Sequence, residues 1–431
     1  MNIFESVPEA EFRQKVHRFA KEHVTPIAEK VEEGMFPRDI LRKLGGQHLL
    51  GAAFSKTDGG GGLNWSFEVI VAEEVSAVSA ATEMARLASG ALYAAPLAYF
   101  ATRAQKDEFL RPVLAGDKVG ALALTEPRAG SDAVSIKTRA ERRSGNFVVT
   151  GQKRFITNGG VADFLFVFAV TDPTKPSRSG VSAIVVPRET NGVQIVKTYG
   201  LLGMHGANVV HLRFRNVKVP GENLIGGLHR GFPILLDELD RERPAVAAGM
   251  LGIARSAFES TVDYSSKREQ FGRPIKEFEG VSFKLSDMLV KLEAARLLIL
   301  KATRLLDEGK LARLEGAIAK LFATESAFEI THQALQVHGG IGYTKDLPIE
   351  RYFRDARFMM IGGGSSEIMR FLINERSTRK DGAGPPDCYF EFCRRVTRYF
   401  SQFGERNNAK KGSILCPQWR SKIIGGSARI S

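Results

Sequence analysis

The sequence predicts a multidomain α+β protein: an N-terminal helical domain, a central antiparallel β-barrel or sandwich, and a C-terminal four-helix bundle. Apolar residues keep helical spacing early in the chain, short β-rich segments crowd the middle, and helical periodicity then returns and persists. The 431 residues allow for about two to four domains of roughly 150 residues each. We place the domains at 1–120, 121–225 and 226–378, and we expect an atypical basic tail at 379–431.

The first domain begins with a helix-start signal. Ser6 and Glu9 have the spacing of a capping box around Pro8, and apolar residues follow at helical intervals. Those apolar residues are Phe12, Val16, Phe19 and Val24. The glycine-rich segment at 56–63 lacks the Gly-Lys-Ser/Thr ending of a phosphate-binding loop, so we predict a flexible turn there.

The middle domain consists of short β-rich segments separated by Gly, Pro and polar clusters, as in a small antiparallel barrel or sandwich. Residues 211–219 (HLRFRNVKV) alternate between polar and apolar side chains, which predicts that one face of this strand meets solvent. Beyond about residue 225, long segments such as 283–306 have the periodicity that is typical of bundle helices.

The composition is that of an ordinary globular protein, with 43% hydrophobic and 25% charged residues. No apolar run reaches the roughly 18 residues of a membrane span, and the N-terminal segment lacks the features of a secretory signal. We therefore expect a cytoplasmic protein, or one of the mitochondrial matrix if the source is eukaryotic.

Much of the net charge of +13 lies in the tail, where 11 Lys/Arg stand against 4 Asp/Glu. The rest of the chain is nearly balanced, so nucleic acid is not an expected partner. The tail also holds all three cysteines, Cys388, Cys393 and Cys416, without a nearby histidine, so we predict no metal site. We expect the tail to be disordered or non-native, as after a shifted reading frame; the alternative is a basic extension that binds a partner.

One carboxylate is predicted to lie on an apolar helix face within 235–253. A stripe that steps by four and three residues contains Leu235, Leu239, Glu242, Val246, Gly249 and Ile253. Burying a lone Glu is costly, and burial moves its pKa toward that of an efficient proton acceptor. Asp237 and Arg241 are predicted to pair on another face, and Pro244 must kink this helix or mark its boundary.

Four further segments combine turns, aromatic residues and charges. In chain order they are ALTEPRAGSD (123–132), GQKRFITNG (151–159), SSKREQFGRPI (265–275) and QVHGGIGYTKDLPIERYFRD (336–355). Each is a weak signal alone, since small-residue turns that could hold an anion are common. Together, in this order and separation, they resemble the acyl-CoA dehydrogenase family, and the resemblance covers roughly residues 1–378. It implies the same three-part fold and an FAD cofactor.

The resemblance assigns three groups of residues to FAD, which the family binds between the β-domain and the C-terminal helices. The flavin ring would meet Leu122, Leu124, Thr125, Phe155 and Thr157, with the Thr157 hydroxyl near N5. The pyrophosphate would meet Gly130 and Ser131, while Ser365 and Glu367 would face the cofactor. A neighbouring subunit's FAD would meet Arg268, Phe271, Gln336, Gly339 and Gly340, which implies a homotetramer or at least a dimer. Phe155 stands where the family often has Trp, and Glu279 where many members have Gln.

Many members of the family carry the catalytic Glu in a Tyr-Glu-Gly-Thr pattern near the C-terminus. The matching residues here are Gly362, Gly363, Gly364 and Ser365, so the usual base is absent. Isovaleryl-CoA and long-chain dehydrogenases instead supply the base from a helix, in an E-R sequence that Glu242 and Arg243 match. The resemblance therefore assigns the base to Glu242, and we interpret Glu367 as structural. The N–H of Gly363 would hold the thioester oxygen together with a ribityl hydroxyl of FAD.

The remaining substrate contacts are also implied by the resemblance. Asp240 and Arg243 match positions that contact CoA, and Ser131 and Gly362 complete the expected substrate-binding set. The alternative for Glu242 is a structural role, as a buried ion-pair partner of Arg243.

The predicted reaction is FAD-dependent dehydrogenation of an acyl-CoA to a trans-2-enoyl-CoA, as in β-oxidation of fatty acids. Glu242 would remove the pro-R α-proton while a β-hydride passes to flavin N5, and an electron-transferring flavoprotein would receive the electrons. One alternative is an acyl-CoA oxidase or a dehydrogenase for cyclic or aryl-substituted acyl groups. Another, from a different class, is a DNA-associated flavoprotein of the alkylation-response branch, which the basic tail suggests and the balanced body opposes.

Overall fold

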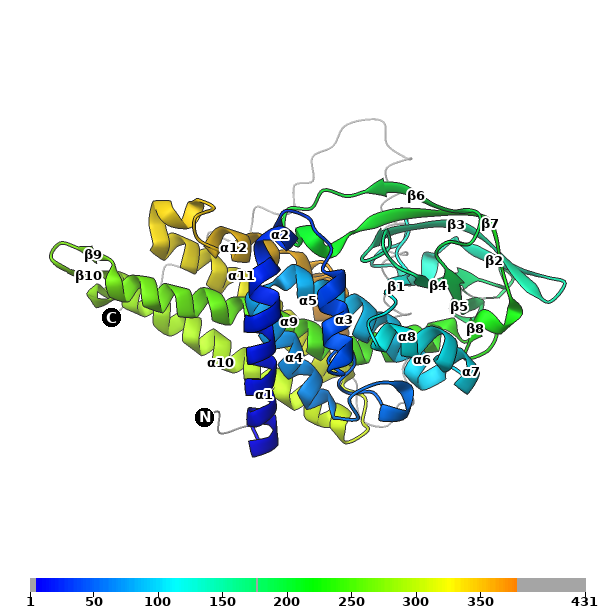
Figure 1. Ribbon diagram of the computed structural model, residues 1–431, viewed down its shortest axis with the longest axis horizontal. Coiled ribbons are helices and arrows are strands. Elements are labelled where there is room, and N and C mark those ends of the chain that lie inside the picture. The colour runs from blue at the N-terminus through cyan, green and yellow to red at the C-terminus, as the bar shows by residue number, and fades with distance from the viewer. Residues whose placement is uncertain (1–4, 176, 378–431) are drawn as a thin grey trace, which may run out of the picture. The chain divides into compact units, whose positions relative to one another are not determined.

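The computed structural model describes residues 5–175 and 177–377. The basic tail, with its three cysteines, lies outside the described residues, and the expectations for it stay predictions. Within the described residues, helices are followed by a β-sheet and then by long helices, which confirms the predicted fold class (Figure 1). None of the described helices combines the length and the apolarity that crossing a bilayer requires.

The helices before the sheet begin with the predicted capping box. The Glu9 carboxylate accepts hydrogen bonds of 2.8 Å from both the backbone N–H and the hydroxyl of Ser6. Val16 and Phe19 are buried on the inner side of the first helix. The helices are α1 (Val7–Phe19), α2 (Ala28–Glu32), α3 (Arg38–Gly46), α4 (Trp65–Val78), α5 (Ala80–Leu87), α6 (Ala94–Phe100), α7 (Arg103–Gln105) and α8 (Arg111–Leu114).

The middle of the chain forms one eight-stranded sheet in the order β6-β7-β3-β2-β4-β5-β8, with β1 paired to β4. Its strands are β1 (Gly120–Ala123), β2 (Arg139–Arg143), β3 (Asn146–Ile156), β4 (Phe164–Val170), β5 (Val181–Pro187), β6 (Val193–Thr198), β7 (Val210–Val219) and β8 (Leu224–Ile225). Most pairings are antiparallel, as predicted. The pairings of β1 and of β2 with β4 run parallel, which the strand pattern did not predict.

Two strands bear directly on the predicted site. β7 alternates buried and solvent-facing residues, as predicted, except where Asn216 takes a left-handed conformation (φ 50°). The pairing of β3 with β7 shifts register between Lys153 and Ile156. Because such irregularities re-aim side chains, this shift determines how Phe155 is presented at the end of β3.

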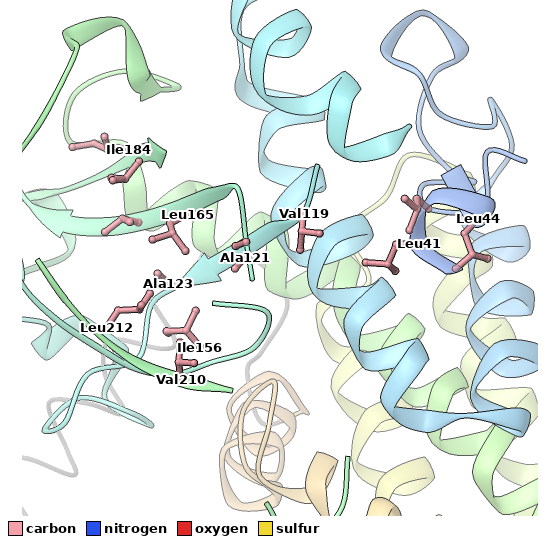
Figure 2. Packing of buried hydrophobic residues seen from close by; sticks show 14 of the residues in the cluster. Leu41, Leu44, Val119, Ala121, Ala123, Ile156, Leu165, Ile184, Val210 and Leu212 are labelled. Atoms are coloured by element: carbon pink, nitrogen blue, oxygen red, sulfur yellow. The ribbon is translucent and has the colours of Figure 1, made fainter. Parts of the chain in front are cut away.

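The hydrophobic core of the sheet continues into the N-terminal helices. Figure 2 shows Leu165, Ile184 and Leu212 of the sheet on one side and Leu41 and Leu44 of α3 on the other. Buried side chains from β1, and from the residue just before it, lie between the two groups. All five of these residues are buried. The sheet and the helices before it therefore share one continuous core, which holds the end of β1 in a fixed position.

The C-terminal part is a helical bundle around one long helix. Its helices are α9 (Gly231–Lys267), α10 (Glu279–Asp307), α11 (Arg313–His338), α12 (Ile349–Ala356) and α13 (Ser366–Ser377), with a short hairpin of β9 (Glu269–Gln270) and β10 (Arg273–Pro274) after α9. α9 is a single helix of 37 residues that packs against α4, α10 and α11 and continues through Pro244. Pro244 thus lies inside the helix, and the predicted alternative of a helix boundary there is wrong.

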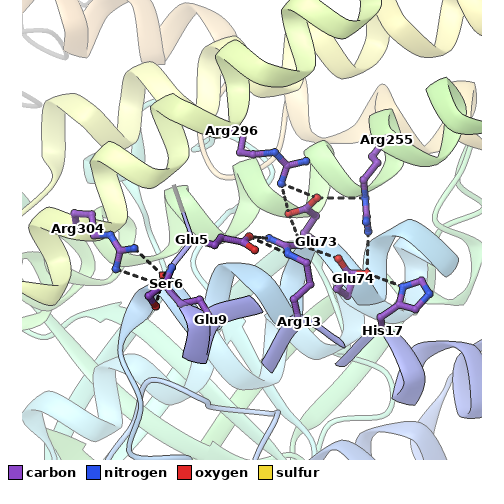
Figure 3. A network of polar contacts seen from close by, with 10 residues as sticks. All are labelled: Glu5, Ser6, Glu9, Arg13, His17, Glu73, Glu74, Arg255, Arg296 and Arg304. Carbon is purple, nitrogen blue, oxygen red and sulfur yellow. Dashed lines mark hydrogen bonds and ion pairs between the residues drawn. The ribbon is translucent and has the colours of Figure 1, made fainter. Parts of the chain in front are cut away.

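A buried polar network joins α1 to α4 and to the C-terminal bundle (Figure 3). Arg13 of α1 contacts Glu73 at 2.8 Å and Glu74 at 2.7 Å, both on α4. Arg296 of α10 reaches Glu73 at 3.0 Å, and Arg255 of α9 reaches Glu74 at 2.9 Å. Burial alone would raise the pKa of Glu73, but the charges of Arg13 and of the two C-terminal arginines lower it to about 2.

Candidate active site

Glu242 lies where the apolar stripe predicted it, inside α9 and only 2% exposed. On the same face Val246, Gly249 and Ile253 are buried as well. Burial raises the pKa of the Glu242 carboxyl, while a hydrogen bond from Glu238 and the charges of Arg243 and Lys320 act in the opposite direction. A buried carboxylate with a raised pKa is suited to accept a proton.

The C-terminal glycine loop lies directly against this carboxylate. Gly363 has φ +62°, and a Cβ atom added to it would lie 2.6 Å from Oε1 of Glu242. The next residue, Gly364, accepts a hydrogen bond of 2.6 Å on its carbonyl from Nζ of Lys320, a buried residue of α11. Among the described residues no acceptor takes the N–H of Gly363, whereas the N–H of Gly362 binds the Phe358 carbonyl at 3.2 Å. A backbone N–H without an acceptor among the described residues and a buried carboxylate therefore lie on neighbouring groups.

Glu367, the other carboxylate of this loop region, has a different environment. It lies in the first turn of α13 and is exposed to solvent. Hydrogen bonds from its own backbone N–H and from the Ser365 side chain lower its pKa. Of the two carboxylates considered for the base, Glu242 alone is buried. Ser365 is half-buried and begins the turn into α13.

Two charged residues, one on α9 and one on α11, were not predicted from sequence to act together with Glu242. Glu238 precedes Glu242 by one helical turn and is 1% exposed. When both groups are treated as carboxylates, neither oxygen of Glu238 has a hydrogen-bond partner among the described residues, and a proton on Glu238 supplies its hydrogen bond to Glu242. The available signal was its i, i+4 spacing from Glu242. Lys320 was also missed, because the sequence of α11 gives no sign that it points toward the glycine loop.

Asp240 and Arg243, the predicted CoA contacts, are held in an ion-pair cluster. Oδ1 of Asp240 lies 3.2 Å from Nη1 of Arg243, and its other oxygen binds Nε of Arg313 at the start of α11. Arg243 thus pairs with Asp240, which weighs against the alternative that Glu242 exists to neutralise Arg243. The predicted pair of Asp237 and Arg241 is present, with Arg241 Nε donating to Asp237 at 2.8 Å.

The predicted flavin-ring residues of β1 and β3 lie at adjacent strand ends. The N–H of Arg154 donates to the carbonyl of Thr125 at 2.7 Å. Nζ of Lys153, which is fully buried, donates to the carbonyl of Leu124 at 2.8 Å and to Oε1 of Glu126 at 2.9 Å. Leu122, Leu124, Thr125 and Thr157 are all half-buried at these ends. The Lys153–Glu126 pair therefore fixes the two strand ends to each other.

The ring of Phe155 is presented to solvent beside these strand ends. Its backbone is left-handed (φ 58°) and it is 52% exposed, which is unusual for a large aromatic residue. The Arg154 guanidinium lies 4.6 Å from the ring centroid, and the Tyr199 ring packs at 4.9 Å. Phe155 is thus braced by its neighbours and still available for stacking.

The remaining cofactor residues lie in exposed turns. Gly130 and Ser131 are exposed after β1, and a Cβ added to Gly130 would meet nothing within 4 Å. Arg268 and Phe271 belong to the β9–β10 hairpin, which Figure 1 shows at the end of the bundle away from the sheet. Gln336, Gly339 and Gly340 lie at the exposed end of α11. Within one chain the structure does not bring the hairpin to Phe155.

Beyond Glu242 along α9, a small cavity lies between α9 and the N-terminal helices. It is lined by Val246, Gly249 and Met250 of α9 and by Ala80, Met84 and Leu87 of α5. Met204 and Met359 also reach it. Ser76 and Glu83 complete the lining, and the enclosed volume is only about 10 Å³. A hydrocarbon group therefore enters only if the flexible methionine side chains move aside.

Comparison with known proteins gives matches along the described chain. Family models match residues 8–117 (acyl-CoA dehydrogenase, N-terminal domain), 121–217 (middle domain) and 229–378 (C-terminal domain). A short-chain specific acyl-CoA dehydrogenase of Clostridium acetobutylicum is 39% identical over 368 residues, which cover 85% of this chain and 97% of the relative.

Solved structures match over similar lengths. The structure of butyryl-CoA dehydrogenase from Megasphaera elsdenii has a TM-score of 0.84 at 35% identity and covers 88% of this chain and 100% of its own. A structure described as the electron transferring flavoprotein of Acidaminococcus fermentans has a TM-score of 0.85 at 36% identity, with 88% and 100% covered.

Proposed function

The chain belongs to the acyl-CoA dehydrogenase family of oxidoreductases, and on that premise we propose that it oxidises an acyl-CoA thioester to a trans-2-enoyl-CoA with FAD as cofactor and Glu242 as base. The observation that carries the proposal is the contact between α9 and the glycine loop. The Glu242 carboxylate occupies the space into which a side chain on Gly363 would project. The usual loop carboxylate and Glu242 can therefore reach the same substrate atom.

The chain's own groups then have complementary tasks. The N–H of Gly363 orients the thioester oxygen and stabilises the negative charge that develops there when the α-proton leaves. Glu242 accepts that proton, and its raised pKa makes the transfer more favourable. Lys320 holds the loop through the Gly364 carbonyl and stabilises the ionised form of Glu242.

The residues near Phe155 fit a flavin. The exposed ring at the end of β3 offers a stacking surface, and the half-buried backbone of Leu124 and Thr125 lies beside it. The open turn at Gly130 leaves room for a diphosphate close to the backbone. FAD, when bound there, would accept the hydride from the substrate β-carbon.

The substrate and the partners follow from the surroundings of Glu242 and from the relatives. The methionine-lined space beside Val246 would hold a hydrocarbon acyl group once its flexible side chains move aside, and the relatives named above support short chains. We propose an electron-transferring flavoprotein as acceptor, which the likeness to the Acidaminococcus structure supports. We also propose a homotetramer, because the hairpin with exposed Arg268 and Phe271 lies at the end of the bundle away from the sheet and would complete a neighbour's site.

Anaerobic bleaching of the bound flavin by a panel of acyl-CoAs tests the proposal. Glu242→Gln should slow flavin reduction by about 10³-fold or more while binding is kept, because the base is lost and the shape remains. Glu367→Gln is the matched control and should reduce its flavin at the wild-type rate. A normal rate for Glu242→Gln together with a loss in Glu367→Gln would transfer the role of base to Glu367.

A further inference from the structure

A second buried carboxyl group lies one helical turn before the proposed base. Glu238 and Glu242 stand at i and i+4 on α9, so their side chains point to the same side of the helix. Both are almost fully buried, with 1% and 2% exposed. Both oxygens of Glu238 and Oε2 of Glu242 have no hydrogen-bond partner among the described residues when the two groups are treated as carboxylates.

The nearby charged groups make their hydrogen bonds to other residues, and Nε of Arg243 has no partner among the described residues. On α9, Arg243 is bound to Asp240, and Asp237 is bound to Arg241. On α11, Lys320 donates to the carbonyl of Gly364 and acts electrostatically on Glu242.

The cations near the dyad do not supply the missing hydrogen-bond donors. Asp240 binds Arg313 as well as Arg243, and Lys320 donates to Gly364. Among the described residues, no cation therefore donates a hydrogen bond to Glu238 or to Oε2 of Glu242. Two adjacent carboxylates in such a place retain one proton between them.

We propose that Glu238 is the positioning residue of the base: it keeps the shared proton and donates it in a hydrogen bond to Glu242, which stays the ionised member of the pair. This rests on the proposed function of Glu242. The proton supplies the donor that the unpartnered oxygens lack. Oε2 of Glu242 is the oxygen left to accept it, while Oε1 faces the Gly363 loop where the substrate would lie.

The asymmetry of the site places the proton on Glu238. Burial and the negative charge of Glu242 raise the pKa of Glu238 well above its ordinary value. Burial also raises the pKa of Glu242, but the hydrogen bond from Glu238 and the positive charges of Arg243 and Lys320 lower it. Lys320 approaches from the side of the glycine loop, so it favours a negative charge on Glu242.

The pH dependence of flavin reduction tests this arrangement in three variants. Glu238→Leu removes the donor at similar volume, so the acid limb of the rate profile should move to higher pH by about one pH unit. Glu238→Gln keeps an N–H donor and should leave the acid limb in place. Asp237→Asn, a neighbour on the same helix, is the matched control. A shift of Glu238→Leu to lower pH, or no shift, would overturn the proposal.

Infrared spectroscopy locates the proton without any turnover. At pH 7 the C=O stretch of a protonated carboxyl should disappear in Glu238→Gln and persist in Glu242→Gln. Glu83→Gln identifies the separate contribution of Glu83, whose pKa burial raises to about 7. The reverse result, a band lost in Glu242→Gln and kept in Glu238→Gln, would refute the assignment. If no acyl-CoA reduces the flavin of the wild type, the proposed function fails while the infrared result still stands.

Discussion

A carboxylate can be moved from α9 to the glycine loop, and the structure predicts that the effect of Gly363→Glu depends on whether Glu242 is still present. A Cβ at residue 363 would lie 2.6 Å from Oε1 of Glu242, a distance that Cβ atoms essentially never show. Gly363→Glu alone therefore adds a side chain to occupied space and places a second negative charge beside the first. In the double variant Glu242→Gly, Gly363→Glu, that space is free.

The magnitudes can be worked out from the backbone and the contact. A side chain at φ +62° costs about 1–2 kcal/mol in both the single and the double variant. The collision with Glu242 adds about 1–3 kcal/mol in the single variant only. Glu242→Gly lowers the free energy of unfolding by about 1 kcal/mol through its poor helix propensity, in the single and in the double variant alike. The double-mutant cycle should thus show a favourable coupling of about 1–3 kcal/mol between the two substitutions.

Urea unfolding of the wild type, both single variants and the double variant measures this coupling. Gly309→Ala is a useful control, because Gly309 also has a positive φ (+72°), has open space around it and has no role in the proposed site. Its loss of stability gives the backbone strain alone, and the excess loss in Gly363→Ala gives the collision. In flavin bleaching, the double variant should recover part of the activity that Glu242→Gly lacks, with a preference for acyl chains that are slim next to the loop. Additive free energies, or a double variant no more active than Glu242→Gly, would refute the reasoning.

Three further predictions concern regions away from the base. Glu73→Gln should lower the free energy of unfolding by about 3 kcal/mol at pH 7, because buried arginines including Arg13 lose their partner. The pKa of Glu73 in the folded protein is lowered to about 2. In unfolding curves measured in acid, the difference from the wild type should therefore disappear as the pH falls from about 4.3 through 2. The Lys153→Met variant should lose FAD faster in dialysis, because the Leu124 carbonyl and Glu126 lose their shared hydrogen-bond donor. Adding Glu126→Gln to this variant should restore part of the free energy of unfolding, because the unpaired buried charge is removed. Unchanged FAD retention in Lys153→Met would mean that the pair does not hold the site. A chain ending at Arg379 should keep its flavin, oligomer and turnover and lose weak, salt-dependent DNA binding; loss of FAD would show instead that the tail belongs to the fold.

The pattern of apolar residues was sufficient to predict the layers of the fold and the burial of Glu242, because both depend on local periodicity. The continuity of α9 through Pro244 could not be predicted, since local sequence allows both a kink and a boundary and only packing against α4 and α11 decides. The parallel pairings of β1 and β2 with β4 depend on long-range contacts. No strand pattern reveals such contacts.

The site shows the same division. The glycines at 362–364 indicated that the usual catalytic carboxylate is absent from this loop. Their contact with Glu242 could not be predicted, because it joins two elements that are far apart in the sequence. Glu238 could have been found from its spacing, whereas Lys320 could not, because its role depends on the path of a loop from α12 to α13. The roles assigned to the flavin and CoA residues stay predictions.

The network around Glu73 and Glu74 limits how early the N-terminal helices can fold while the chain is being synthesised. These carboxylates lie on α4, but two of the arginines that bind them, Arg255 and Arg296, are translated much later. Until α9 and α10 have left the ribosome, α4 has Arg13 but lacks most of its counter-charge, and buried carboxylates without it are costly. We therefore expect the N-terminal helices to stay partly open and hydrated until α9 and α10 have been made and have docked.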